Sequence, residues 1–187
     1  MSFLGPEIWQ KVYSHDTSGG LFANLDEAKQ KNIDNEDAAL FSILYNLESM
    51  RNADGVFHFK LCYPEQTKHE FPCNEWIQSS NPLLESTITG YASVNLTWTK
   101  NGINGPFQGL GLSPSSLDNL IDDTPNDGYW FNSIGTLTYW GSGTIPGPRE
   151  SGGLKVKKKD LYVQYRPSKS NMQQYTRTFS FLKIVCP

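Results

Sequence analysis

The stretch from Gly55 to Pro82 constrains the fold more than any other part of this chain. It reads GVFHFKLCYPEQTKHEFPCNEWIQSSNP and holds two of the three cysteines and two of the three histidines. Its first residues, 56–63, alternate between two sets of side chains, which is typical of a β-strand with one buried face. One set is Phe57, Phe59, Leu61 and Tyr63, and the other is Val56, His58, Lys60 and Cys62. The segment therefore predicts a half-buried strand.

Similar patterns recur along the chain and predict a mainly β fold. Further strands are predicted at 8–13, 74–79, 87–99, 106–112, 129–140, 154–165 and 178–185. Turn pairs such as Asn101-Gly102 and Asp127-Gly128 separate several of them. We expect an antiparallel β-sandwich of the jelly-roll type.

Two helices are expected beside these strands. An amphipathic helix is predicted near 35–51 because its apolar residues recur at helical spacing. These residues are Leu40, Ile43, Leu44, Leu47 and Met50. Asp34 or Asn35 would cap its start, and its apolar stripe would pack on a sheet face. A short helix is predicted at 24–31.

The composition fits one globular domain. The 187 residues are 37% hydrophobic and 13% aromatic, which excludes a disordered chain. We expect a single domain over 1–187, with 166–187 as a C-terminal extension. The net charge of −3 does not fit a nucleic-acid-binding protein, which needs a basic surface. No apolar run reaches the roughly 18 residues of a membrane span.

The basic run Lys155–Lys159 reads KVKKK. It predicts a solvated edge strand, because lysines on an edge discourage pairing with other strands. Contact with phosphate or glycosaminoglycan is the alternative interpretation.

The cysteines favour an extracellular protein. Cys62 and Cys73 enclose ten residues that include two prolines, and such a loop can fold back to form a disulfide. Three reduced cysteines are the alternative, and Cys186 is left over in either case. Asn95-Leu96-Thr97 is an acceptor sequence for N-glycosylation on the polar face of its predicted strand. The N-terminus lacks a signal peptide, so a secreted form would need a leader that this sequence does not include.

No catalytic residue is predicted. There is no Gly-x-Ser-x-Gly motif, and His58 and Cys62 would stand about 13 Å apart on one strand. His15, His58 and His69 are scattered among mostly polar neighbours, which favours ordinary surface positions over a zinc site. Calcium is a candidate cofactor, because Asp122, Asp123 and Asp127 lie in one short loop. The alternative is an ordinary cluster of turn residues.

A mixture of aromatic and amide residues predicts ligand binding. The candidate contact residues are Asn74, Glu75, Trp76, Gln78, Asn81, Trp130 and Trp140, with Asn132 and Tyr139 nearby. Amides and carboxylates can meet sugar hydroxyls, while flat aromatic rings take the apolar face of a sugar. The alternative places the tryptophans in the core and the amides in turns.

Several motifs resemble uncharacterised extracellular domains of marine invertebrates such as cnidarians. They are FHFKLCYPE (57–65), NEWIQSSNP (74–82), GLGLSPSS (109–116), IDDTP (121–125), YWFNSIG (129–135), TIPGP (144–148) and LYV (161–163). The similarity covers about residues 8–165. It implies a secreted or matrix protein and carries no known activity.

Three functions remain open at this point. The favoured one is a non-enzymatic, lectin-like recognition module whose partners are glycans or matrix proteins. The second is a matrix or biomineral scaffold protein that self-assembles through Cys186 and the lysine strand. The third is an enzyme of unrecognised class, which would require two carboxylates or a His–carboxylate pair in one deep pocket.

Overall fold

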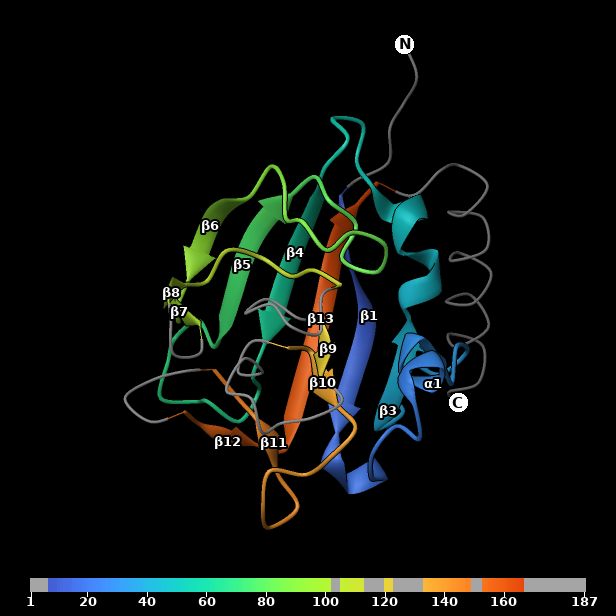
Figure 1. The fold of residues 1–187 in the computed structure, drawn as a ribbon, viewed down its shortest axis with the longest axis vertical. Coiled ribbons are helices and arrows are strands. Elements are labelled where there is room, and N and C mark those ends of the chain that lie inside the picture. The colour runs from blue at the N-terminus through green and yellow to red at the C-terminus, as the bar shows by residue number, and fades with distance from the viewer. Residues whose placement is uncertain (1–6, 102–104, 113–119, 123–132, 149–152, 167–187) are drawn as a thin grey trace, which may run out of the picture.

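A seven-stranded antiparallel sheet organises the protein (Figure 1). The computed structural model describes residues 7–101, 105–112, 120–122, 133–148 and 153–166. The strands of the sheet follow the order β2 (Gln30–Lys31), β3 (Leu40–Ile43), β1 (Ile8–Asp16), β13 (Lys158–Tyr165), β4 (Phe57–Cys62), β5 (Cys73–Gln78) and β6 (Ala92–Leu96). The prediction of a mainly β, antiparallel fold is confirmed.

The central strand comes from the far end of the described chain. β13 lies between β1 and β4, and its pairing with β1 runs from Ile8 opposite Tyr165 to Asp16 opposite Lys158. A bulge at Val12 interrupts that register. The segments that are most distant in sequence are therefore direct neighbours in the sheet.

The remaining elements are short. The two-stranded pairs are β7 (Lys100–Asn101) with β8 (Gly105–Pro106), β9 (Ile121–Asp122) with β10 (Gly135–Thr136), and β11 (Ile145–Pro146) with β12 (Lys155–Val156). The helical segments are η1 (Thr17–Gly19), α1 (Leu25–Lys29) and η2 (Leu44–Met50). A second large sheet is not among the described residues, so the sandwich stays a prediction.

One face of the large sheet forms the core. The alternation predicted for β4 is confirmed, because Phe57, Phe59 and Leu61 are buried and the residues between them are half-buried. Trp76 stacks on Phe59 with ring centroids 5.3 Å apart and meets Phe107 edge-on at 4.8 Å. In Figure 1 β9 and β10 lie in front of β13 and β1, and β11 and β12 lie at the lower end of the sheet. The described residues between β6 and β12 form a covering layer that contributes core side chains, namely Trp98, Phe107, Leu110, Leu120, Ile121, Ile134 and Ile145.

The predicted helix at 35–51 is wrong in its first half. Leu40–Ile43 is strand β3, which pairs with Tyr13, Ser14 and His15 of β1. The segment Leu44–Met50 is a 3-10 helix whose Leu44, Leu47 and Met50 are buried. Their spacing of three residues matches one face of a 3-10 helix. Leu40 and Phe41 pair with β1, a strand distant in sequence that the local pattern does not indicate.

The short helix predicted at 24–31 is confirmed as α1 over Leu25–Lys29, whereas Gln30–Lys31 is strand β2. Asn24 is its N-cap and accepts a hydrogen bond from the Glu27 amide at 2.9 Å. The Glu27 carboxylate in turn accepts from the Ala23 amide at 2.6 Å. These reciprocal bonds satisfy amides that the first helical turn leaves unpaired.

Several predicted strands are shorter than expected. Within 87–99 only β6 is a strand. Before it, the Thr89 carbonyl accepts a hydrogen bond from the Ser79 amide, and Gly90 turns the chain with a positive φ of 64°. The segment 106–112 keeps only Pro106, and Gly109 turns the chain with a φ of 98°. Within 129–140 the strand is Gly135–Thr136. Residues 129–132 and 178–185 lie outside the described residues.

The lysine run is not an edge strand. Lys155 lies in β12, whereas Lys158 and Lys159 begin β13, the central strand. Lys159 is fully buried and its Nζ donates to the Ser133 carbonyl at 2.6 Å. A lysine in this position can be buried because a backbone acceptor from the covering layer meets its ammonium.

The predicted disulfide is confirmed. Cys62 and Cys73 are bonded and lie directly opposite each other on β4 and β5. The bond closes the hairpin next to its loop, 63–72. Cys186 lies outside the described residues. Within the part of the chain that is described, no helix is long and apolar enough to cross a membrane.

Candidate functional site

Most of the predicted contact residues lie in the interior. Asn74, Trp76 and Gln78 are fully buried, and Asn81 is 2% exposed. Asn74 and Gln78 bind the backbone of the covering layer, since their side chains bond Trp98 and Leu110. The prediction of a ligand-contact surface at these four side chains is therefore corrected, because they lie inside the protein. They attach the covering layer to the sheet.

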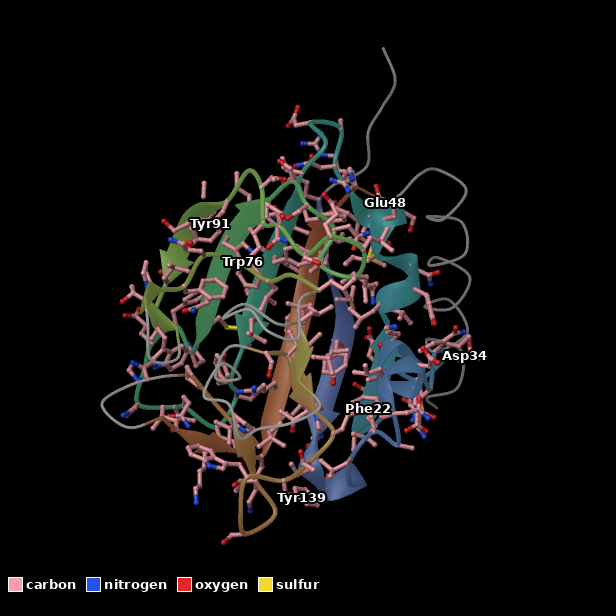
Figure 2. The ribbon with its side chains drawn as sticks, in the orientation of Figure 1. Phe22, Asp34, Glu48, Trp76, Tyr91 and Tyr139 are labelled. Atoms are coloured by element: carbon pink, nitrogen blue, oxygen red, sulfur yellow. A yellow bond between two sulfur atoms is a disulfide. The ribbon has the colours of Figure 1, made fainter. Side chains whose placement is uncertain are left out.

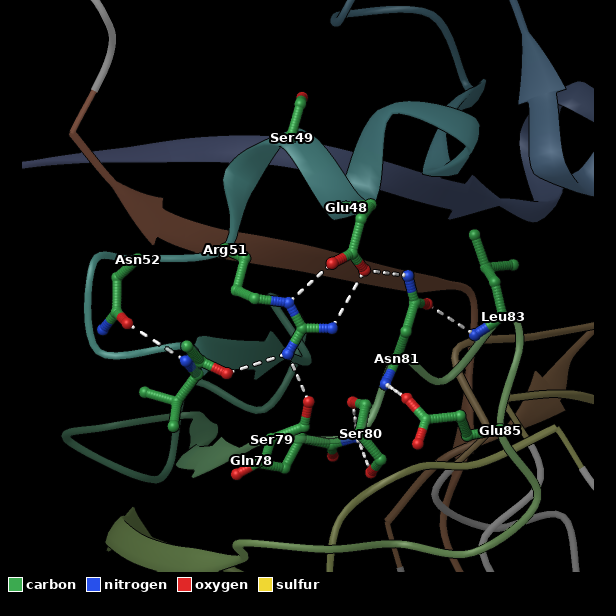
Figure 3. A network of polar contacts seen from close by, with 12 residues as sticks. Glu48, Ser49, Arg51, Asn52, Gln78, Ser79, Ser80, Asn81, Leu83 and Glu85 are labelled. Carbon is green, nitrogen blue, oxygen red and sulfur yellow. Dashed lines mark hydrogen bonds and ion pairs between the residues drawn. The ribbon is translucent and has the colours of Figure 1, made fainter.

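Asn81 belongs to a polar clamp between η2 and the segment that follows β5 (Figure 3). Its Nδ2 donates to Glu48 Oε2 at 2.8 Å, while Arg51 donates to both oxygens of Glu48 at 2.6 and 2.9 Å. Arg51 also donates to the backbone carbonyls of Gly55 and Ser79. These charge-assisted bonds lower the pKa of Glu48, chiefly through Arg51. The clamp is structural.

Glu75 differs from the other four because strand alternation turns it to the opposite face of the sheet. His58 Nε2 lies 2.7 Å from its Oε1. Lys60, the cross-strand neighbour of Glu75, places its Nζ 4.0 Å from the centre of the Trp9 ring. Burial lowers the pKa of Lys60. This His–carboxylate pair stands on the outward sheet face and does not line the pocket described below.

The other predicted site residues are separate from these. Trp140 is half-buried, with Lys155 Nζ 5.3 Å from its ring centroid, and Tyr139 is 42% exposed. Asp122 ends β9. Trp130, Asn132, Asp123 and Asp127 lie outside the described residues. Among the residues that are described, no group of three or more His, Cys, Asp or Glu side chains could hold a metal ion.

An open pocket lies where α1 and β2 approach η2. Its volume is about 710 Å³, and it is broadly open to solvent. It is lined by Asp26, Glu27, Gln30, Lys31, Asn32, Ile33, Asp34, Asn35 and Tyr45. Tyr45 is 57% exposed and Ile33 is 50% exposed. The pocket thus combines apolar surface with amide and carboxylate groups.

Local structure holds the pocket wall in place. Asn32 adopts a positive φ of 50°, and its Nδ2 donates to the Leu40 carbonyl at 2.7 Å. The Asn35 amide bonds the Asn32 carbonyl at 2.8 Å, which closes a turn. Asn tolerates this left-handed conformation better than most residues. Asp34, inside the turn, lies at the outer margin of the molecule beside α1 (Figure 2).

Sequence reasoning missed this pocket. The sequence predicts a short helix at 24–31 and a second helix near 35–51 that Asp34 or Asn35 would cap. Tyr45 lies inside the second predicted helix and outside its apolar stripe. The sequence signal for this pocket is the aromatic side chain of Tyr45, which does not share the spacing of Leu44, Leu47 and Met50. Its neighbours across the pocket are brought there by the pairing of β2 with β3.

Comparison with known proteins finds no family model, curated protein or solved structure that matches this chain. The function is therefore inferred from the residues and their arrangement.

Proposed function

We propose that this protein is a non-enzymatic, extracellular recognition module that binds carbohydrate in the pocket around Tyr45. The observation that carries the proposal is the exposed tyrosine beside amide and carboxylate side chains in one open pocket. The ring offers a flat surface to the apolar face of a sugar, and Gln30, Asn35 and Asp34 offer donors and acceptors to its hydroxyls.

Three further observations support an extracellular setting. The Cys62–Cys73 disulfide is the kind of bond that persists in oxidising compartments. Asn95, in the acceptor sequence, is exposed on β6. The resemblance to extracellular domains of marine invertebrates agrees with both. Calcium binding at Asp122, Asp123 and Asp127 stays a prediction.

A glycan array tests the proposal with the protein at neutral pH, with calcium and again with chelator. We expect binding to one class of sugar, and loss in chelator would support a calcium anchor. Tyr45→Ala should weaken binding by roughly tenfold because it removes the aromatic contact, whereas Tyr45→Phe should retain most of it.

Tyr139→Ala is the matched control, because Tyr139 is also exposed and does not line the pocket. A blank array with correctly folded wild-type protein would remove the proposal. Binding that Tyr45→Ala leaves unchanged would place the sugar site elsewhere.

A second candidate function is self-assembly into a matrix, which the edge strand β6 favours. No described strand pairs with its outer side, four of its five residues are exposed, and Val94 is 52% exposed. An uncharged edge of this kind can pair with another chain. The enzyme alternative has less support, because the His58–Glu75 pair lies outside the pocket.

A further inference from the structure

The charges of the Tyr45 pocket are unbalanced. Among its lining residues, Asp26, Glu27 and Asp34 carry three negative charges and Lys31 carries one positive charge, which leaves two negative charges. A ligand that enters the pocket therefore meets a negative potential, and its own charge decides whether the pocket attracts or repels it.

The single lysine is already occupied. Lys31 Nζ donates to Glu27 Oε1, and this bond is the main reason that the pKa of Glu27 is lowered. The opposite charges of this pair largely cancel each other. Lys31 is therefore a poor partner for an anionic ligand.

Asp34 is the carboxylate best placed to receive a cation. It is exposed, and no described Lys, Arg or His forms an ion pair with it. Asp26, by contrast, has Lys29 at 3.6 Å. Tyr45, on the same pocket, adds an aromatic face, which also attracts cations.

Building on the proposed function, we propose that this pocket selects amino sugars that carry a free ammonium group over neutral and anionic sugars. The sugar ring would lie on Tyr45, and its ammonium would meet Asp34. One unit charge at about 4 Å from another is worth about 1 kcal/mol in water, which corresponds to roughly fivefold in affinity. An acidic sugar would be disfavoured by a similar factor.

Calorimetry with three matched tetrasaccharides tests this selectivity. The probes are a glucosamine tetramer, an N-acetylglucosamine tetramer and a uronic acid tetramer, at about pH 6, where an ordinary amine is charged. We expect the glucosamine tetramer to bind roughly fivefold more tightly than the neutral one. Asp34→Asn should remove most of that preference by weakening the glucosamine tetramer more than the neutral one, and about 1 M salt should reduce the preference as well.

The control is Asp54→Asn, because Asp54 is exposed and does not line the pocket. If the neutral tetramer binds as tightly as the cationic one and Tyr45→Ala weakens both, the selectivity is wrong and the carbohydrate proposal stands. If the glycan array shows only neutral or acidic sugars, the selectivity is again wrong. If neither the tetramers nor the array show binding, both proposals fail.

Discussion

At the scale of the residue, burial decides what His15 can do. His15, on β1, is fully buried. Its ring meets Phe22 edge-on, with centroids 5.2 Å apart. Burial, and then the nearby Lys159 charge, lower its pKa to about 4. The scattered histidines of the sequence suggested ordinary surface positions, and for His15 that interpretation is wrong.

This lowered pKa predicts a loss of stability in mild acid. Between about pH 6.5 and 4 the unfolded chain binds a proton at His15 and the folded chain does not. The free energy of unfolding should therefore fall as the pH falls through this window, by at most about 1.4 kcal/mol per pH unit from this residue. Urea unfolding of wild type and His15→Asn at several pH values measures it.

The comparison between the two proteins separates His15 from the carboxylates, which titrate in both. The variant should be less stable at pH 7, because it alters a buried contact, but its pH dependence should be flatter. Parallel curves for the two proteins across the window would contradict the assignment.

A second residue-scale feature is the close approach at Gly135. A Cβ built there would lie 1.8 Å from Tyr13 Oη and 3.1 Å from His15 Nδ1. Only glycine lets β10 of the covering layer come this close to β1. The sequence shows the glycine, but its role depends on two residues more than a hundred positions away.

At the scale of the element, the β4–β5 hairpin depends on its disulfide. A covalent bond between residues that are 11 positions apart restricts the unfolded chain and should contribute about 3 kcal/mol to stability. We expect Cys62→Ala with Cys73→Ala to lower the free energy of unfolding by about this amount. Urea denaturation followed by fluorescence, with and without reductant, measures the change.

The reductant provides the internal control for this prediction. It should destabilise wild type to nearly the level of the double variant and have no effect on the double variant. Equal stability of wild type and variant under oxidising conditions would show that the hairpin does not need the bond.

Elements differ in how far they could be predicted. Five elements lie close to where the sequence predicts them, namely β1, β4, β5, β13 and α1. Alternating side chains or a capping residue within each segment indicate these elements. Strand β3 is not predicted by the sequence, because Leu40 and Phe41 are apolar residues at positions that fit a helix equally well. The pocket was missed for a related reason, since it forms only when β2 pairs with β3.

At the scale of the whole molecule, the edge strand β6 of the large sheet is the feature that bears on self-assembly. Self-assembly through β6 predicts a population of oligomers that grows with protein concentration, because the unpaired edge joins another copy. Val94→Lys should make the protein monomeric by placing a charge on that edge. Sedimentation velocity over a hundredfold range of concentration, on the order of micromolar upward, measures the distribution.

Leu84→Lys is the control, because Leu84 is 70% exposed and lies outside β6. It should associate as wild type does. A wild-type protein that stays monomeric over the whole range would remove self-assembly from the candidate functions.

The sequence alone determined the mainly β fold, the principal strands and the Cys62–Cys73 bond, because these follow from patterns and partners within a short stretch of chain. Only the tertiary structure decided that Lys159 is buried, that Asn74 and Gln78 point inward, and that Tyr45 borders a pocket. Lys159 is buried where β13 inserts between β1 and β4 and where Ser133 covers it. Asn74 and Gln78 are covered by the segments that carry Trp98 and Leu110, and the pocket at Tyr45 forms where β2 pairs with β3. The burial of a side chain depends on what covers it, and the covering residues come from other parts of the chain.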